Sequence, residues 1–177
     1  ELYENKAKVE KKAPKEYDTN KVKQDAARAE QDITYQNVMA NLAILEEEGK
    51  LKWTDKVKDR IPEFKMYNDY VTENFNILDL LTHRSGLGLG VGDLMFFPDG
   101  SNFTVKDVLT SFQHFKPVSA FRTQFDYDNQ LYIVAGEIIA RTSGMSWEDF
   151  VQKRIMTPLE MNGCPAPRCG SSTCVNR

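Results

Sequence analysis

A polar opening followed by an apolar stripe makes up the stretch Phe125-Asp-Tyr-Asp-Asn-Gln-Leu-Tyr-Ile-Val-Ala-Gly-Glu-Ile-Ile139. The apolar residues recur at helical spacing, and the pattern stops at Ser143-Gly144. An aspartate, Asp126 or Asp128, stands before the stripe where a helix N-cap is expected. The stretch therefore predicts a buried helix entered through a polar turn.

Amphipathic patterns on both sides of this stretch predict further helices. The first covers residues 37–48 and ends at Gly49, and a short buried one covers 77–81. Another begins after Thr104, where Asp107 completes a capping box. Ser146 caps a last helix that Pro158 closes, and residues 51–62 read as an extended piece with a short helical turn. Strand signals are scarce, so a mostly helical fold is expected.

Composition limits the classes of partner. The chain has 177 residues, of which 41% are hydrophobic and 28% charged, a range typical of one globular domain or one domain plus a tail. Its net charge is −3 and no basic stripe is present, which argues against nucleic acid as a partner. No apolar run reaches the roughly 18 residues that a membrane-spanning helix needs. We therefore expect no membrane span.

The two ends differ in composition from the middle. Residues 1–36 are rich in charge and poor in apolar residues, which predicts a helical or unstructured arm. Residues 164–177 form an irregular tail with three evenly spaced cysteines, Cys164, Cys169 and Cys174. This number and spacing fit neither a disulfide framework nor a zinc site, and their role stays open. We assign no metal and no cofactor.

Two sites suggested by short motifs are weak. The glycines of residues 86–92 lack the lysine and the spacing of a phosphate-binding or dinucleotide-binding loop, so a structural loop is favoured. Asp79, His83 and Ser85 suggest an acyl-transfer triad, but residues this close in sequence seldom form one, and a hydrogen-bonded structural histidine is favoured. Tyr127 and Asn129 could point together into a cleft, but the turn taken alone favours packing of Tyr127 and capping by Asp126 or Asp128.

Several stretches, taken in order, resemble one family. They are Leu42-Ala-Ile-Leu-Glu-Glu-Glu-Gly-Lys-Leu51, Asp79-Leu-Leu-Thr-His-Arg-Ser-Gly-Leu87, Phe125-Asp-Tyr-Asp-Asn129, Tyr132-Ile-Val-Ala-Gly-Glu-Ile-Ile, Gly144-Met-Ser-Trp-Glu-Asp-Phe-Val151 and Ile155-Met-Thr-Pro-Leu-Glu-Met161. Together they make residues 37–163 resemble the serine hydrolases of the penicillin-binding-protein and class C beta-lactamase group, which includes D-alanyl-D-alanine peptidases and related esterases. The third stretch is similar to that family's Tyr-Xaa-Asn motif.

The resemblance implies specific roles for two residues. Tyr127 would be the catalytic proton shuttle, and Asn129 would bind the substrate amide. In the family a serine attacks the carbonyl and a lysine three residues later assists its deprotonation. The corresponding positions here hold Asp32 and Tyr35, and no lysine of the chain has Ser or Thr three residues before it. The nearest approach is Ser119-Ala-Phe-Arg122, whose arginine cannot act as a base.

The family's Lys/His-Ser/Thr-Gly motif is also missing. The chain therefore reads as a truncated or frame-disrupted relative: the helical part of a beta-lactamase/DD-peptidase-like α/β domain with the sheet largely missing. Acyl-serine hydrolysis of D-Ala-D-Ala peptides, beta-lactams or esters describes the family, and we expect this copy to be catalytically incompetent. The alternative is a noncatalytic module that binds a cell-wall peptide or a protein partner.

Exposure and location follow from the same resemblance. Without its sheet the helical layer would expose apolar surface, which favours self-association or a partner chain. Any substrate would be a small molecule or peptide of cell-wall type. The family's usual role at the cell wall implies a periplasmic or extracellular location.

Overall fold

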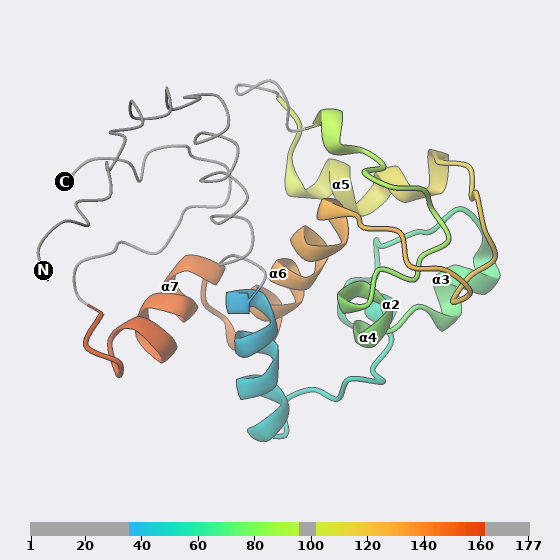
Figure 1. Cartoon of the computed structure of the whole chain (residues 1–177). Helices are drawn as coiled ribbons and strands as arrows, with labels where there is room; N and C mark the ends of the chain where they lie inside the picture. The colour runs from blue at the N-terminus through green and yellow to red at the C-terminus, as the bar shows by residue number, and fades with distance from the viewer. Residues whose placement is uncertain (1–35, 96–101, 162–177) are drawn as a thin grey trace, which may run out of the picture. The chain divides into compact units, whose positions relative to one another are not determined.

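The computed structural model describes residues 36–95 and 102–161 (Figure 1). These residues belong to one compact unit, Thr34–Arg177, and a second unit comprises Glu1–Ile33. The charged arm predicted for residues 1–36 lies outside the described residues except for its last member, and so does the cysteine tail of residues 164–177. Both stay predictions.

Helices dominate the described part of the chain (Figure 1). A helix over residues 36–47 is followed by the α-helices α2 (Val57–Arg60), α3 (Asp69–Asn74), α4 (Ile77–Leu81), α5 (Val105–Ser111), α6 (Asn129–Ser143) and α7 (Trp147–Val151). Two 3₁₀ turns, η1 (Asp93–Met95) and η2 (Phe112–His114), and a π-helical turn, η3 (Gln152–Met156), complete the list. In this part of the chain the only β pairing is an isolated bridge between Lys56 and Asn76. The mostly helical fold class is confirmed.

Side-chain caps fix where the helices begin. The side chain of Thr104 accepts from the backbone N–H of Asp107, and the Asp107 side chain accepts in return, which is the capping box expected from the sequence. Asn76 and Asp79 form a second capping box at the start of α4. Ser146 caps α7 as expected. These caps satisfy N–H groups that would otherwise lack partners in the first turn.

The long helix α6 organises the core. Of the two N-cap candidates it is Asp128 that accepts from the N–H of Gln130, and Gly144, at φ 71°, ends the helix in the left-handed conformation. α6 packs against α2, α4, α5 and α7, and it runs through the middle of the ribbon in Figure 1. Its buried apolar residues are Leu131, Val134, Ala135, Ile138 and Ile139. Because the whole apolar stripe is covered, α6 is the element on which its neighbours assemble.

The helix α3 was not predicted from the sequence, and neither was the π-helical geometry of η3. The helix α3 begins at the N-cap Asn68, whose side-chain oxygen accepts from the N–H of Val71. It buries only Val71 and Thr72, too few to give a periodic pattern. The π-helical turn η3 continues α7 to Met156, close to the stop expected at Pro158.

None of the described helices has both the length and the apolar content needed to cross a membrane.

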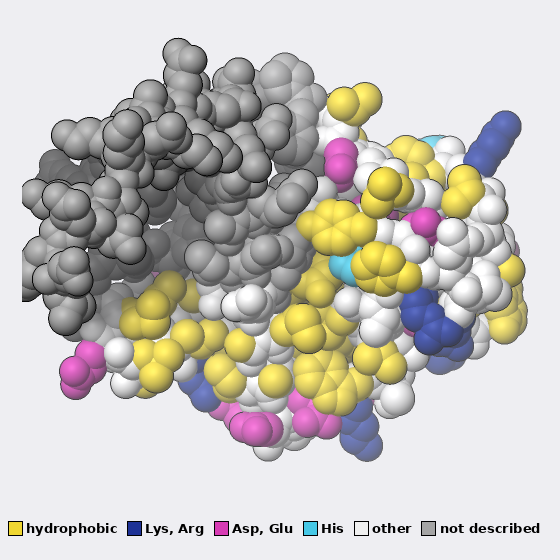
Figure 2. Space-filling view, in the orientation of Figure 1, with side chains coloured by type: hydrophobic (Ala, Val, Ile, Leu, Met, Phe, Trp, Pro, Cys, Tyr) yellow, Lys and Arg dark blue, Asp and Glu magenta, His cyan; other side chains and the backbone are white. Residues whose placement is uncertain are grey.

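Large apolar side chains remain on the surface of the described part. Figure 2 shows hydrophobic side chains spread across one face, with few charged groups between them. The most exposed are Tyr70, Leu89, Leu94, Val118, Phe125 and Leu159, each more than 60% accessible. Exposed apolar surface was expected for a helical layer without its sheet.

Candidate functional site

The N-terminal end of α6 holds the two residues singled out in the sequence. Tyr127 and Asn129 flank the N-cap Asp128, and both side chains are partly accessible while Asp128 is fully buried. Because the cap fixes the backbone between them, the tyrosine and the amide are presented on the same turn. The turn meets the glycine loop, since the N–H of Gly90 donates to the carbonyl of Tyr127 at 2.8 Å.

A chain of hydrogen bonds joins Tyr127, Asn129 and Asp93. The Tyr127 hydroxyl donates to Oδ1 of Asn129 at 3.0 Å. Nδ2 of Asn129 in turn donates to Oδ1 of Asp93 at 3.1 Å. The structure therefore brings together the two predicted residues and adds a carboxylate. Asp93 was missed in the sequence because it lies 36 positions before Asn129 in a loop without periodicity.

The buried side chain of His83 packs against this turn. Its side chain is 5% exposed, and its ring lies 4.9 Å from that of Tyr127 and 5.1 Å from that of Tyr132, measured between centroids. Nδ1 of His83 accepts from the backbone N–H of Asp128 at 3.1 Å, and the carbonyl of His83 accepts from the N–H of Asp126. Burial lowers the pKa of His83 to about 4, so the ring is neutral near pH 7. A neutral ring can accept this bond.

Asp128 carries the opposite shift. Burial raises the pKa of Asp128 to about 7, the bond from the N–H of Gln130 opposes the rise, and the charge of Asp93 adds to it. Oδ2 of Asp128 is buried without a hydrogen-bond partner. The N-cap thus holds an acidic side chain that is poorly solvated.

The Leu-Thr-His-Arg-Ser-Gly stretch works as a structural loop. Asp79 is 5% exposed and accepts from Nε and Nη2 of Arg122, at 2.9 and 2.8 Å. Arg122 also donates to the carbonyl of Asn74 at 2.8 Å. This bidentate pair joins the start of α4 to the segment before α6. A charge-assisted pair of this kind is among the stronger polar contacts in proteins.

The three residues of the imagined triad are not arranged for acyl transfer. Ser85 is fully buried, and its Oγ accepts from the N–H of Leu87 at 3.1 Å. Asp79 is paired with Arg122, and Nδ1 of His83 is engaged by the backbone of Asp128. No hydrogen bond links these three side chains in the part of the chain that the structure describes. Their contacts are those of packed, structural residues.

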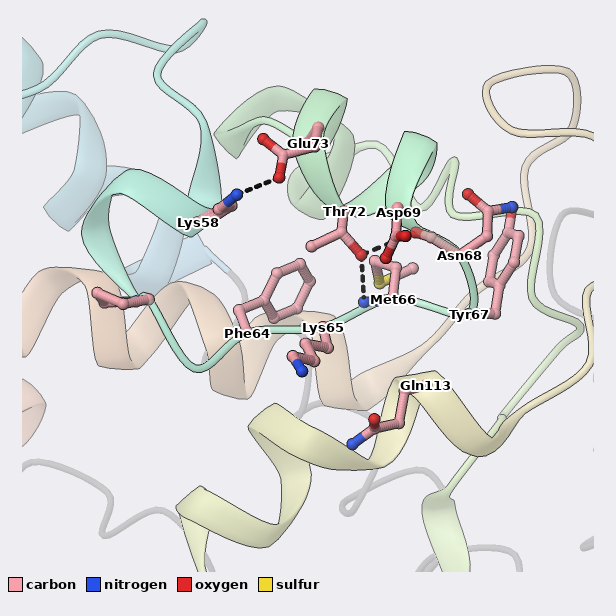
Figure 3. A pocket seen from close by; sticks show the side chains of 11 residues that line it. Lys58, Phe64, Lys65, Met66, Tyr67, Asn68, Asp69, Thr72, Glu73 and Gln113 are labelled. Carbon is pink, nitrogen blue, oxygen red and sulfur yellow. Dashed lines mark hydrogen bonds and ion pairs between the residues drawn. The ribbon is translucent and has the colours of Figure 1, made fainter.

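A cavity of about 460 Å³ lies elsewhere, between α2, α3 and η2 (Figure 3). Some of its polar side chains already have partners. Lys58 pairs with Glu73, and Oγ1 of Thr72 accepts from the N–H of Met66 and donates to the carbonyl of Asn68. None of the residues assigned to chemistry lines it. We therefore assign no function to this cavity.

Within the described ranges no three His, Cys, Asp or Glu side chains cluster to hold a metal ion.

Comparison with known proteins decides the family. The family model described as Beta-lactamase matches residues 38–167. The chain belongs to the Beta-lactamase family. The resemblance seen in residues 37–163 is thereby confirmed, and the Tyr127 turn and the residues 79–87 loop both fall inside the match.

Individual relatives and structures agree with this assignment. The unguisins hydrolase ungD' of Aspergillus campestris is 26% identical over 128 residues, 70% of this chain and 24% of that protein. Penicillin-binding protein 4* of Bacillus subtilis is 29% identical over 124 residues, 68% of this chain and 26% of that protein. The chain thus spans about a quarter of these curated relatives' length.

Solved structures give the same fold. The octameric penicillin-binding protein homologue from Pyrococcus abyssi aligns with TM-score 0.61 and 28% identity, over 73% of this chain and 30% of that one. The D-amino acid amidase from Ochrobactrum anthropi SV3 aligns with TM-score 0.58 and 25% identity, over 72% and 35%. The Beta-lactamase family fold is therefore shown for the helical part that this chain supplies.

Proposed function

We propose that this chain carries the Tyr-Xaa-Asn side of an acyl-serine hydrolase site and that it does not form an acyl-enzyme by itself. Tyr127 is the proton-transfer residue in this proposal, and Asn129 is the ligand for the substrate amide. The observation that carries it is the bonded pair of Tyr127 and Asn129 on the capped first turn of α6. Family membership supplies the reaction class.

The reaction explains why this side alone is insufficient. In acyl transfer to serine, the serine oxygen bonds to the carbonyl carbon, its proton passes to a base, and the leaving group departs with a proton. Tyr127 can relay that proton because its hydroxyl both donates and accepts. The nucleophile must come with a base at helical spacing, and no lysine of this chain follows a Ser or Thr by three positions. Donor groups without a nucleophile give small accelerations.

Two serines of the described part, Ser85 and Ser119, do not supply the missing group. Ser85 is fully buried and bonded to the backbone of Leu87. Ser119 is followed three residues later by Arg122, which is bound to Asp79 and stays protonated at all working pH values. Both observations support incompetence of this chain taken alone.

A noncatalytic binding role is the second candidate, and exposed apolar groups favour it. Leu89 and Leu94 stand beside the glycine loop at 77% and 83% exposure, and Phe125 precedes Tyr127 at 64%. Such groups suit the apolar parts of a peptide or of a protein partner. D-Ala-D-Ala peptides, beta-lactams and esters remain the candidate ligands, since the relatives include penicillin-binding proteins and a D-amino acid amidase.

Labelling with a fluorescent penicillin and with a fluorophosphonate, followed by mass spectrometry, tests the proposal. We expect no adduct on any serine. We also expect saturable binding of a D-Ala-D-Ala peptide that Asn129→Ala weakens about tenfold, because a hydrogen-bond donor to the substrate is lost. Asn74→Ala is the matched control, since that amide donates only to the carbonyl of Tyr70. A stoichiometric adduct on Ser85 or another serine would overturn the proposed incompetence.

A further inference from the structure

The contact between Asn129 and Asp93 bears on which ligand the site accepts. Nδ2 of Asn129 is the donor assigned to a substrate carbonyl, and it is held by Oδ1 of Asp93 at 3.1 Å. A ligand that takes this donor must therefore meet the Asp93 carboxylate. Asn129 and Asp93 are both partly accessible.

Contacts on both sides hold this arrangement in place. The N–H of Gly90 donates to the carbonyl of Tyr127, and the side chain of Gln130 donates to the carbonyl of Gly92. Gly92 has φ 79°, and a Cβ there would overlap the Gln130 amide, so the loop lies directly against the first turn of α6. Asp93 follows at the start of η1. The backbone contacts of the loop therefore hold the Asp93 carboxylate close to the first turn of α6.

Asp93 brings a negative charge to the turn. Asp93 takes part in no ion pair with another described residue, whereas its charge reaches the buried Asp128. The imidazole beside the turn, that of His83, is neutral because burial lowers its pKa to about 4. A carboxylate on the ligand would be repelled here, and an ammonium would be attracted.

The spacing of donor and acceptor narrows the ligand class further. The site offers an acceptor, Oδ1 of Asp93, 3.1 Å from a donor, Nδ2 of Asn129. In an α-amino carbonyl compound the amino nitrogen and the carbonyl oxygen are also about 3 Å apart, as standard bond lengths require. Such a ligand can donate from its ammonium to Asp93 while its carbonyl accepts from Asn129. The exchange replaces one internal hydrogen bond with two to the ligand.

We propose that Asp93 selects ligands with a free ammonium group beside the carbonyl, so that α-amino amides and peptides with an unblocked amino end are preferred over neutral or anionic analogues. This rests on the proposed function, because it takes the amide of Asn129 as the ligand for the carbonyl. It makes Asp93 a specificity-determining residue of the site. The ammonium and the carboxylate form a charge-assisted hydrogen bond, which is about twice as strong as a neutral one.

Two nearly isosteric ligands test it on the whole chain. D-alanine amide carries the ammonium, and D-lactamide has a neutral hydroxyl in its place. Binding is followed by the NMR shifts of the Asn129 side-chain NH₂ group. We expect D-alanine amide to bind about tenfold more tightly, and we expect Asp93→Asn to bring the two affinities within about twofold of each other, since a charge-assisted bond becomes a neutral one.

The control variant is Asp59→Asn, which removes the same charge from an exposed position on α2 and should keep the preference. Equal affinities in the unchanged chain would overturn the inference, and so would a preference that survives in Asp93→Asn. Absence of binding by both ligands would also overturn it. The labelling experiment is independent: a serine adduct refutes the proposed incompetence whatever the ratio of these two affinities.

Discussion

Residues 79–87 and the start of α6, which meet at His83, differ in the partners of their polar side chains. In the loop of residues 79–87, Asp79, Ser85 and Gly86 are engaged by a guanidinium, by backbone groups and by close packing. At the start of α6, Tyr127, Asn129 and Asp93 bond side chain to side chain and stay partly accessible. The first region holds the fold together, and the second is the one that we propose for ligand binding. A match to a sequence motif therefore does not tell whether its residues are structural or functional. The partners of their side chains make that distinction.

The largest effect should come from breaking the pair that anchors the residues 79–87 loop. Arg122→Ala leaves the Asp79 carboxylate buried without its guanidinium, and we expect a loss of about 3 kcal/mol in the free energy of unfolding. Arg141→Ala is the control. Its ion pairs with Glu63 and Glu137 are about one-third exposed, so less than about 1 kcal/mol should be lost. Urea unfolding measures both, and equal losses would show that burial of the carboxylate, 5% exposed in Asp79 and 35% in Glu63, makes no difference.

A smaller loss is expected at Gly86. This residue has φ 82°, and a Cβ would stand 2.7 Å from the backbone oxygen of Ser119. Gly86→Ala should lower stability by about 2 kcal/mol more than Gly49→Ala does, because overpacking adds to the backbone strain that both share. Gly49 has φ 69° with nothing within 4 Å of the added atom. Thermal or urea unfolding of both variants gives the difference, and equal effects would mean that the loop yields easily.

The pH dependence of stability should separate the two buried groups at the turn. The pKa of His83 is lowered from 6.5 to about 4, so its contribution is present above pH 6.5 and is lost as the pH falls through 4. The pKa of Asp128 is raised from 3.8 to about 7, so its contribution is present below 3.8 and is lost as the pH rises through 7. Between pH 7 and pH 4 the two contributions oppose each other.

Single variants should expose each contribution. On going from pH 7 to pH 4, Asp128→Asn should lose about 2 kcal/mol relative to the unchanged chain, and His83→Asn should gain about as much. Asparagine retains the capping ability at position 128 and tolerates the positive φ of 51° at position 83. Urea unfolding at the two pH values measures both changes. A parallel pH profile for all three chains would show that neither group titrates differently on folding.

The smallest effect on stability is expected at the candidate site itself. Tyr127→Phe removes the hydroxyl that donates to the partly accessible Asn129, and we expect a loss below about 1 kcal/mol. Tyr70→Phe, 69% exposed on α3, should change nothing measurable. If Tyr127→Phe destabilised the chain as much as Arg122→Ala, the turn would belong to the scaffold. A small loss of stability with impaired ligand binding would sharpen the division.

Local patterns in the sequence determined most of the helices, several of their caps and the family. The apolar stripe from Leu131 to Ile138 predicted α6 because burial on one face imposes a helical period, and Thr104, Asp107 and Ser146 marked helix starts because their side chains satisfy nearby N–H groups. The Tyr127 and Asn129 pair was visible for the same reason, being two positions apart. All of these interactions join residues within one or two helical turns.

Only the tertiary structure decided which distant groups meet. Arg122 reaches Asp79 across 43 positions, Asp128 donates to His83 across 45, and Asn129 donates to Asp93 across 36. No periodicity records such pairs, since each depends on how loops return to the start of α6 once the core has packed. The sequence therefore determined which family this chain belongs to and where its tyrosine and amide lie. The packing decided that His83 and Arg122 support the turn and that a carboxylate faces the amide.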